Sequence, residues 1–269
     1  PGNLKVIGRA GIGVDNVDLP AATQAGIVVM NTPFGNAITT AEHAIAMMFA
    51  AARQIPAANA ETQEGKWPKS GYMGTEVSYK TLGLIGCGNI GSRVAERAIG
   101  LKMKVAAYDP FLTDERAVEL GVEKVELEDL LTRADVITLH VPLTEQTRNV
   151  LSREALEKTK KGLILVNCAR GGLVDEEAVK DLLESGHIQA AAFDVFAVEP
   201  AKDNVLFGAQ DKRLAGELFR AFSRTTKQRR AAAEEAHRTL KLINLDQYAD
   251  QPAGAIDELH RSCTAIADG

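Results

Sequence analysis

The chain has 269 residues, of which 45% are hydrophobic and 25% are charged, and its formal net charge is −5 at pH 7. This composition is that of a globular protein, and the acidic balance argues against nucleic acid or an anionic membrane surface as the main partner. No apolar run reaches the roughly 18 residues that a membrane-spanning helix needs.

Short apolar runs rich in β-branched residues alternate with amphipathic segments as far as about Gly208. This alternation predicts an α/β fold with a doubly wound parallel sheet, because strands that are buried on both faces read as continuous apolar runs. The expected strands are residues 5–10, 26–31, 81–86, 104–108, 135–141, 162–167 and 190–195, and the expected helices include residues 90–101, 127–133, 153–160 and 175–184.

Residues 37–60 are rich in alanine and are predicted to be helical, with a break at Pro56. The segment is too apolar to face water on all sides, so we expect it at a domain interface or a subunit interface. Residues 64–79 contain several glycines and a proline and are predicted to form a loop before a new domain core. Beyond Gly208 the alternation stops, and a charged, exposed helix is expected there.

The cysteines Cys87, Cys168 and Cys263 lie far apart and form no CxxC pair. The sequence therefore predicts neither a disulfide framework nor a metal site, and a reducing compartment, the cytoplasm, is expected. Cys87 and Cys168 are interpreted as small buried residues rather than nucleophiles. Because the chain begins at Pro1 without a signal-type segment, we expect it to be part of a longer protein.

The strongest chemical signal is the run Gly86-Cys87-Gly88-Asn89-Ile90-Gly91, which follows one expected strand and opens a helix. In a dinucleotide-binding motif, the first glycine permits a tight turn and the second lets the backbone approach a pyrophosphate at the positive helix N-terminus. The third glycine allows the helix to pack closely on the sheet. The alternative interpretation is an ordinary tight turn between a strand and a helix.

Asp109 follows the next expected strand, at the distance where an acidic residue accepts hydrogen bonds from the adenosine ribose. A 2′-phosphate would meet this carboxylate as a like charge, so the sequence favours NAD over NADP. The alternative is an ordinary surface aspartate.

With these motifs in view, the sequence resembles the D-isomer-specific 2-hydroxyacid dehydrogenases. The resemblance implies a Rossmann-type NAD domain over residues 34–208, an incomplete flavodoxin-like substrate domain over residues 1–33, and a tail of unknown role over residues 209–269 that is expected to be helical. The segments that carry it are residues 8–18, 30–33, 41–43, 86–91, 140–144, 166–176 and 193–200.

The resemblance also implies roles for individual residues. Arg170 would hold the substrate carboxylate, and Glu199 would pair with a proton-transferring histidine. Without the resemblance, Arg170 could be an ion-pair or cap residue, and Glu199 a loop carboxylate. The implied cofactor-binding residues are Ile12, Gly86, Gly88, Asn89, Ile90, Gly91, Asp109, Val141, Cys168, Ala169, Arg170 and Asp194, and the implied substrate-binding residues are Gly11, Ile12, Gly13 and Arg170.

The sequence departs from the family pattern at two places. The family has a further segment of the substrate domain before the equivalent of Pro1. Its catalytic histidine lies in a Pro-His-hydrophobic-Gly motif shortly after the glutamate, whereas residues 211–219 here contain no histidine. His43 and His140 are interpreted as packing residues, and His187 as an exposed turn residue.

The implied activity is NAD-dependent oxidation of a small 2-hydroxy acid to a 2-keto acid, with 3-phosphoglycerate of serine biosynthesis as the foremost substrate, in a homodimer or larger homo-oligomer. Loss of the histidine predicts impaired turnover. One alternative is a non-catalytic NAD(H)-binding protein that signals cofactor state through a partner, and another is an inert truncated product.

Overall fold

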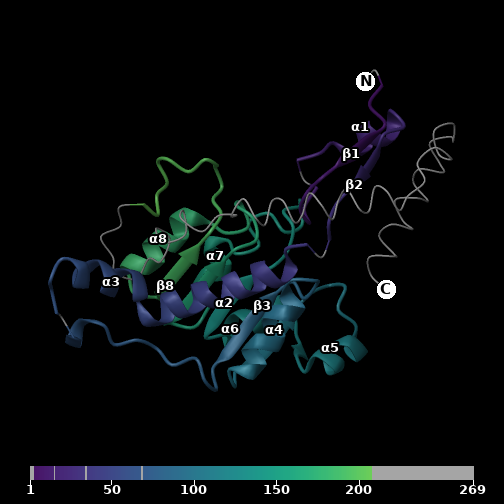
Figure 1. The fold of residues 1–269 in the computed structure, drawn as a ribbon. Coiled ribbons are helices and arrows are strands. Elements are labelled where there is room, and N and C mark those ends of the chain that lie inside the picture. Colours follow the sequence, from purple (N-terminus) through teal and green to yellow (C-terminus); the bar gives the residue numbers. More distant parts are fainter. Residues whose placement is uncertain (1–2, 15, 34, 68, 208–269) are drawn as a thin grey trace. The chain divides into compact units, whose positions relative to one another are not determined.

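The computed structural model describes residues 3–207 except Asp15, Phe34 and Pro68 (Figure 1). These residues divide into two compact units, residues 3–38 and residues 39–207, and each unit is described by itself. The tail expected over residues 209–269 lies outside the described residues, as does the stretch without histidine at residues 211–219.

The first unit is a small β-α-β arrangement. Strand β1 (Val6–Gly8) pairs in parallel with strand β2 (Val28–Met30). Helix α1 (Leu19–Gln24) connects them, and the Asp18 carboxylate caps it by accepting a hydrogen bond from the Ala21 amide. The sequence prediction contains both strands but not α1, because six residues are too few to show a helical periodicity.

The second unit is built on a six-stranded sheet in which every pair of neighbours is parallel, in the order β5-β4-β3-β6-β7-β8. The strand order reverses between β3 and β6, which is where doubly wound sheets place their ligands. This arrangement confirms the predicted fold class. The strands are β3 (Thr81–Ile85), β4 (Lys104–Tyr108), β5 (Glu123–Lys124), β6 (Val136–Leu139), β7 (Leu163–Asn167) and β8 (Ile188–Phe193).

Helices cover both faces of this sheet. On one face α2, α4 and α5 pack in one hydrophobic core, and on the other face α6, α7 and α8 pack in a second core. Helix α3 has no buried residue. The helices are α2 (Ala37–Arg53), α3 (Ile55–Gln63), α4 (Gly91–Gly100), α5 (Asp114–Leu120), α6 (Leu127–Arg133), α7 (Arg153–Glu157) and α8 (Glu176–Glu184), with a short 3-10 turn at Lys69–Gly71.

The strands contribute alternate side chains to the two cores. On β7, Ile164 and Val166 join the core under α2 and α4, whereas Leu163 and Leu165 join the core under α6 to α8. Successive side chains of a strand point to opposite faces, so burial of both faces requires a continuous apolar run. This requirement explains why the central strands could be predicted from the sequence.

Helix α2 accounts for the alanine-rich stretch. Its small side chains Ala41, Ala44 and Ala51 are buried against the sheet, and Figure 1 shows the helix running across the sheet beside α4. The apolar composition of α2 is therefore explained by the sheet of its own unit. The break expected at Pro56 falls at Gln54, which has a positive φ of 51°, because proline is tolerated in the first turn of the helix that follows.

Candidate functional site

The candidate cofactor residues of the second unit lie directly after the carboxyl ends of parallel strands. The carboxyl ends of parallel strands share one edge of a sheet, so these residues meet there although they are far apart in the sequence. The residues are Gly86 after β3, Asp109 after β4, Val141 near the end of β6, Cys168, Ala169 and Arg170 after β7, and Asp194 after β8.

Two glycines of the loop after β3 are required by close backbone contacts. Gly86 has a positive φ of 92°, and a Cβ atom there would lie 2.6 Å from Cγ1 of Val141. A Cβ atom on Gly91 would lie 2.1 Å from the carbonyl oxygen of Gly86. Only glycine therefore lets α4 start this close to the end of β3, and lets the loops after β3 and β6 approach each other.

Gly88 differs from these two glycines, since a Cβ atom there would meet no atom within 4 Å. The backbone at Gly88 thus borders open space at the start of α4. The N-cap residue Ile90 offers no side-chain hydrogen bond to the first amides of that helix. Open space beside helix amides fits a bound pyrophosphate.

Asp109 ties the end of β4 to this glycine loop. Its Oδ2 accepts a hydrogen bond of 2.7 Å from the Cys87 amide, and its Oδ1 accepts one of 2.8 Å from the Phe111 amide. Each carboxylate oxygen keeps a further lone pair for a ribose hydroxyl. Burial, together with this negative charge, raises the pKa of the Cys87 thiol to about 11.

Asn167 fixes the loop that carries Arg170. Its buried side chain accepts a hydrogen bond from the Ala169 amide at 3.1 Å and donates one to the Arg170 carbonyl at 2.9 Å. The Arg170 guanidinium donates to the Ala169 carbonyl at 2.8 Å. Asn167 was not among the predicted site residues, although a polar residue at the end of a buried apolar strand is a signal of such a role.

The loops of Arg170 and Glu199 are packed against each other. A Cβ atom on Gly171 would lie 1.8 Å from the carbonyl oxygen of Phe196, and the amide of Phe196 donates to Glu199 Oε1 at 3.1 Å. Glu176, at the start of α8, holds the same loop by accepting hydrogen bonds from the Ala197 amide and the Asn204 side chain, at 2.8 and 2.6 Å. No pattern in the sequence indicated this role for Glu176.

His43 of α2 lies beside Asp194 at the end of β8, with 3.6 Å between Nε2 and Oδ1. The Nε2 atom is buried, whereas the Asp194 side chain is one-third exposed. The interpretation of His43 as a packing residue therefore misses a charged neighbour. No local pattern in the sequence signals this contact, which depends on how α2 crosses the sheet.

Burial shifts the pKa values of two further titratable groups at this edge. Burial lowers the pKa of His140 to about 4, and it raises the pKa of Cys168 far above its usual value, with Asp194 as a second cause. Cys87 and Cys168 are both buried, as expected for packing residues. His187 is only partly exposed, and its Nε2 lies 3.1 Å from Thr159 Oγ1, so the expectation of an exposed turn residue is wrong.

The candidate substrate-binding residues Gly11, Ile12 and Gly13 belong to the first unit. Asn31 donates a hydrogen bond of 2.8 Å to the Ile12 carbonyl, and the Thr32 amide donates one of 3.2 Å to the Gly11 carbonyl. The Asn31 side chain and the Thr32 amide, both after β2, thus hold this loop in place by hydrogen bonds. Its role toward cofactor and substrate stays a prediction.

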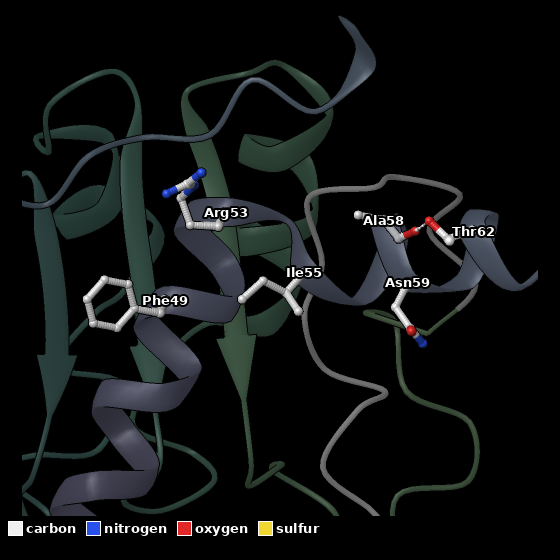
Figure 2. Close-up of a pocket in the computed structure, with 6 residues that line it drawn as sticks. All are labelled: Phe49, Arg53, Ile55, Ala58, Asn59 and Thr62. Carbon is white, nitrogen blue, oxygen red and sulfur yellow. Dashed lines mark hydrogen bonds between the residues drawn. The ribbon is translucent and has the colours of Figure 1, made fainter. Parts of the chain in front are cut away.

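A separate open groove of about 630 Å³ lies where α2 meets α3 (Figure 2). Two hydrogen bonds place the end of α2, which borders the groove, near the start of β8. The Ala52 carbonyl accepts a hydrogen bond from the Thr75 amide, and Thr75 Oγ1 accepts one from the Gln189 side chain near the start of β8. The groove therefore lies at the amino edge of the sheet. Its lining residues are Phe49, Arg53, Ile55, Ala58, Asn59 and Thr62.

Within residues 3–207, apart from the three gaps, no group of three or more His, Cys, Asp or Glu side chains could hold a metal ion. None of the helices in that part of the chain combines the length and apolar character that crossing a membrane requires.

Comparison with known proteins identifies the domain that carries the site. The model of the "D-isomer specific 2-hydroxyacid dehydrogenase, NAD binding domain" matches residues 45–214. D-3-phosphoglycerate dehydrogenase of Bacillus subtilis is 50% identical over 204 residues, and that of Archaeoglobus fulgidus is 53% identical over 205 residues. Both alignments cover 76% of this chain and 39% of the relative, so the chain spans about two fifths of the length of these curated relatives.

Solved structures agree with the sequence comparison. A glyoxylate reductase from Paecilomyes thermophila superposes with a TM-score of 0.79 at 32% identity, covering 88% of this chain and 71% of that one. D-lactate dehydrogenase from Aquifex aeolicus, complexed with NAD and lactic acid, gives a TM-score of 0.78 at 29% identity, covering 89% and 76%. The matched domain type and the NAD complex among these structures support NAD as the cofactor.

Proposed function

Because this chain belongs to the D-isomer specific 2-hydroxyacid dehydrogenase family, we propose that it serves as the NAD-binding part of an oxidoreductase that interconverts a 2-hydroxy acid and a 2-keto acid. The proposed substrate pair is 3-phosphoglycerate and 3-phosphohydroxypyruvate, the reaction that opens serine biosynthesis in the cytoplasm. This choice is supported by relatives named D-3-phosphoglycerate dehydrogenase at 50% and 53% identity. The observation that carries the proposal is the packing of the Arg170 and Glu199 loops at the sheet edge that also holds the glycine loop.

The order of the strands suggests how the cofactor lies along this edge. Asp109 would accept hydrogen bonds from the adenosine ribose, and the open backbone at Gly88 would face the pyrophosphate. The nicotinamide would then extend past Val141 toward Asp194. When bound, NAD supplies the hydride acceptor for the reaction.

Two residues of the chain have a role in the reaction in this proposal. Arg170 binds the substrate carboxylate, because a planar guanidinium can donate two parallel hydrogen bonds to it. The Asn167 side chain holds the backbone of that arginine in place. Glu199 accepts a hydrogen bond from a proton-transferring group and stabilises its charged form.

The family pattern assigns the proton transfer to a histidine that residues 211–219 do not contain. Losing one general acid or base typically costs about 10²–10⁴ in rate. We therefore propose that the chain binds NAD(H) but turns over slowly. The same feature favours a second candidate, a non-catalytic NAD(H)-binding protein that acts through a partner.

We also propose that the chain forms a homodimer through the segment that follows α2. Four large apolar side chains there are mostly exposed: Ile55 at 51%, Trp67 at 81%, Met73 at 84% and Tyr79 at 79%. Apolar exposure concentrated in one segment beside a groove is typical of an association surface. Sedimentation analysis should find a dimer, and Trp67→Ser should shift it toward monomer; a wild-type monomer would overturn this proposal.

The assay that tests the proposed function follows NADH oxidation at high protein concentration with 3-phosphohydroxypyruvate, pyruvate or glyoxylate as acceptor. Turnover that prefers 3-phosphohydroxypyruvate and is lost in Arg170→Gln, but not in the exposed control Arg148→Gln, supports the phosphoglycerate enzyme. NADH binding without turnover of any acceptor favours the non-catalytic candidate. Turnover that prefers another acceptor overturns the substrate assignment.

A further inference from the structure

Arg93 lies in the first turn of α4, next to the open backbone at Gly88. Its Nη1 donates a hydrogen bond of 2.7 Å to the carbonyl of Asn89, so the side chain reaches back onto the glycine loop. This direction is the natural one, because helical side chains lean toward the helix N-terminus. Arg93 was not among the residues predicted to bind the cofactor.

The contacts of α4 show which side of the helix Arg93 occupies. Arg97 lies one turn further along the same flank, and its Nη2 is 3.2 Å from Oε1 of Glu42 on α2. The start of α2 in turn lies beside the end of β8, through the contact of His43 with Asp194. Arg93 is therefore on the flank that faces the strands from β6 to β8, across the point where the strand order reverses.

The two arginines differ in their electrostatic surroundings. In the described part of the chain, both ion pairs made by α4 belong to Arg97, with Glu42 and Glu96. The hydrogen bond that the Arg93 guanidinium makes goes to a neutral carbonyl and uses one of its five N–H donors. A guanidinium without a carboxylate counter-ion thus lies beside open space at a helix start that no side chain caps.

We propose that Arg93 is a further cofactor-binding residue whose guanidinium binds a phosphate of the dinucleotide's pyrophosphate. The inference rests on NAD binding by this domain and adds the residue that would neutralise the pyrophosphate charge. Guanidinium groups suit this task because their rigid fork of donors matches phosphate oxygens. Asp109 would define the adenosine end of the site, and Arg93 its centre.

The test measures the affinity of the full chain for NADH and for adenosine, which contains no phosphate. Arg93→Gln removes the charge, Arg93→Lys keeps it, and Arg97→Gln is the matched control on the same flank. We expect Arg93→Gln to weaken NADH binding by about ten-fold or more at low ionic strength, and Arg93→Lys to restore part of it. The gap between wild type and Arg93→Gln should shrink in high salt, and adenosine should bind both proteins alike.

Other outcomes would overturn the inference. If folded Arg93→Gln binds NADH within about two-fold of wild type, Arg93 does not contact the cofactor. If adenosine is weakened as much as NADH, Arg93 only supports the shape of the loop. Thermal melting establishes that each variant is folded. A folded wild-type chain that binds no NADH would refute the proposed function as well, which separates the two failures.

Discussion

Gly171 and Phe196 are in contact at a distance that only glycine permits, since a Cβ atom on Gly171 would lie 1.8 Å from the carbonyl oxygen of Phe196. Gly171 follows Arg170, and the Phe196 amide is hydrogen-bonded to Glu199. The contact therefore joins the loop that holds the proposed carboxylate-binding arginine to the loop that holds the proposed acid–base partner.

Gly171→Ala should separate these two loops. The new methyl group would clash with the backbone of Phe196 and Ala197, a clash that cannot be relieved by rotating a side chain. We therefore expect the free energy of unfolding to fall by about 1–3 kcal/mol. Gly100→Ala is the control, because a Cβ atom at that helix end meets nothing within 4 Å. Urea denaturation compares them; a Gly171→Ala protein as stable as wild type would refute the close contact.

Gly88→Ala and Gly91→Ala should affect different properties, the first NADH affinity and the second stability. A methyl group at Gly91 would meet the Gly86 carbonyl at 2.1 Å and should destabilise the fold, whereas one at Gly88 enters open space. Gly88→Ala should therefore melt like wild type and lose NADH affinity, because the methyl group takes the place of the pyrophosphate. Unchanged NADH affinity in Gly88→Ala would place the pyrophosphate elsewhere.

Asp109→Ala should weaken NADH binding by about 1–3 kcal/mol, since charge-assisted hydrogen bonds to the ribose are lost. The variant also loses the bonds to the Cys87 and Phe111 amides, so its melting temperature is measured in parallel. Asp109→Asn keeps the size of the side chain and removes the like-charge conflict with a 2′-phosphate, so it should improve NADPH binding relative to NADH. Equal NADH affinity in wild type and Asp109→Ala would refute the ribose assignment.

His140 should make stability depend on pH. Burial lowers its pKa to about 4 from the usual 6.5, so below pH 6.5 the unfolded chain takes up a proton that the folded chain does not. The stability associated with neutral His140 is present above pH 6.5 and is lost as the pH falls toward 4, by about 2 kcal/mol between pH 7.5 and pH 5.

His140→Gln should reduce this pH dependence when denaturation is measured at both pH values. His187→Gln is the matched control, because each histidine places Nε2 close to a threonine hydroxyl, at 3.0 Å for His140 and 3.1 Å for His187. If His140→Gln loses stability over the same pH range as fully as wild type, His140 does not titrate as its burial implies.

The sheet and the glycine loop were predictable because their signals are local. The central strands are buried on both faces and therefore appear as continuous apolar runs, such as residues 163–166, and the loop at residues 86–91 is a single uninterrupted motif. Strand β5 was missed because its two residues, Glu123 and Lys124, are exposed and charged. Helix α5 was missed because seven residues show too little periodicity.

The contacts that complete the site could not be predicted in the same way. Glu176 holds a loop that begins at Ala197, and His43 meets Asp194 only after α2 has crossed the sheet. Such contacts depend on how distant segments pack, and neither glutamate nor histidine at these positions stands out from its neighbours in the sequence. The resemblance to the family indicated Arg170 and Glu199, whereas the structure gives the packing that joins their loops.

The most direct measurement is a calorimetric titration of the purified, folded chain with NADH and with NADPH. We predict one NADH site per chain and clearly weaker binding of NADPH, because the Asp109 carboxylate opposes a 2′-phosphate. A folded chain that binds neither dinucleotide, or that binds NADPH as tightly as NADH, would contradict the assignment of this sheet edge as an NAD site.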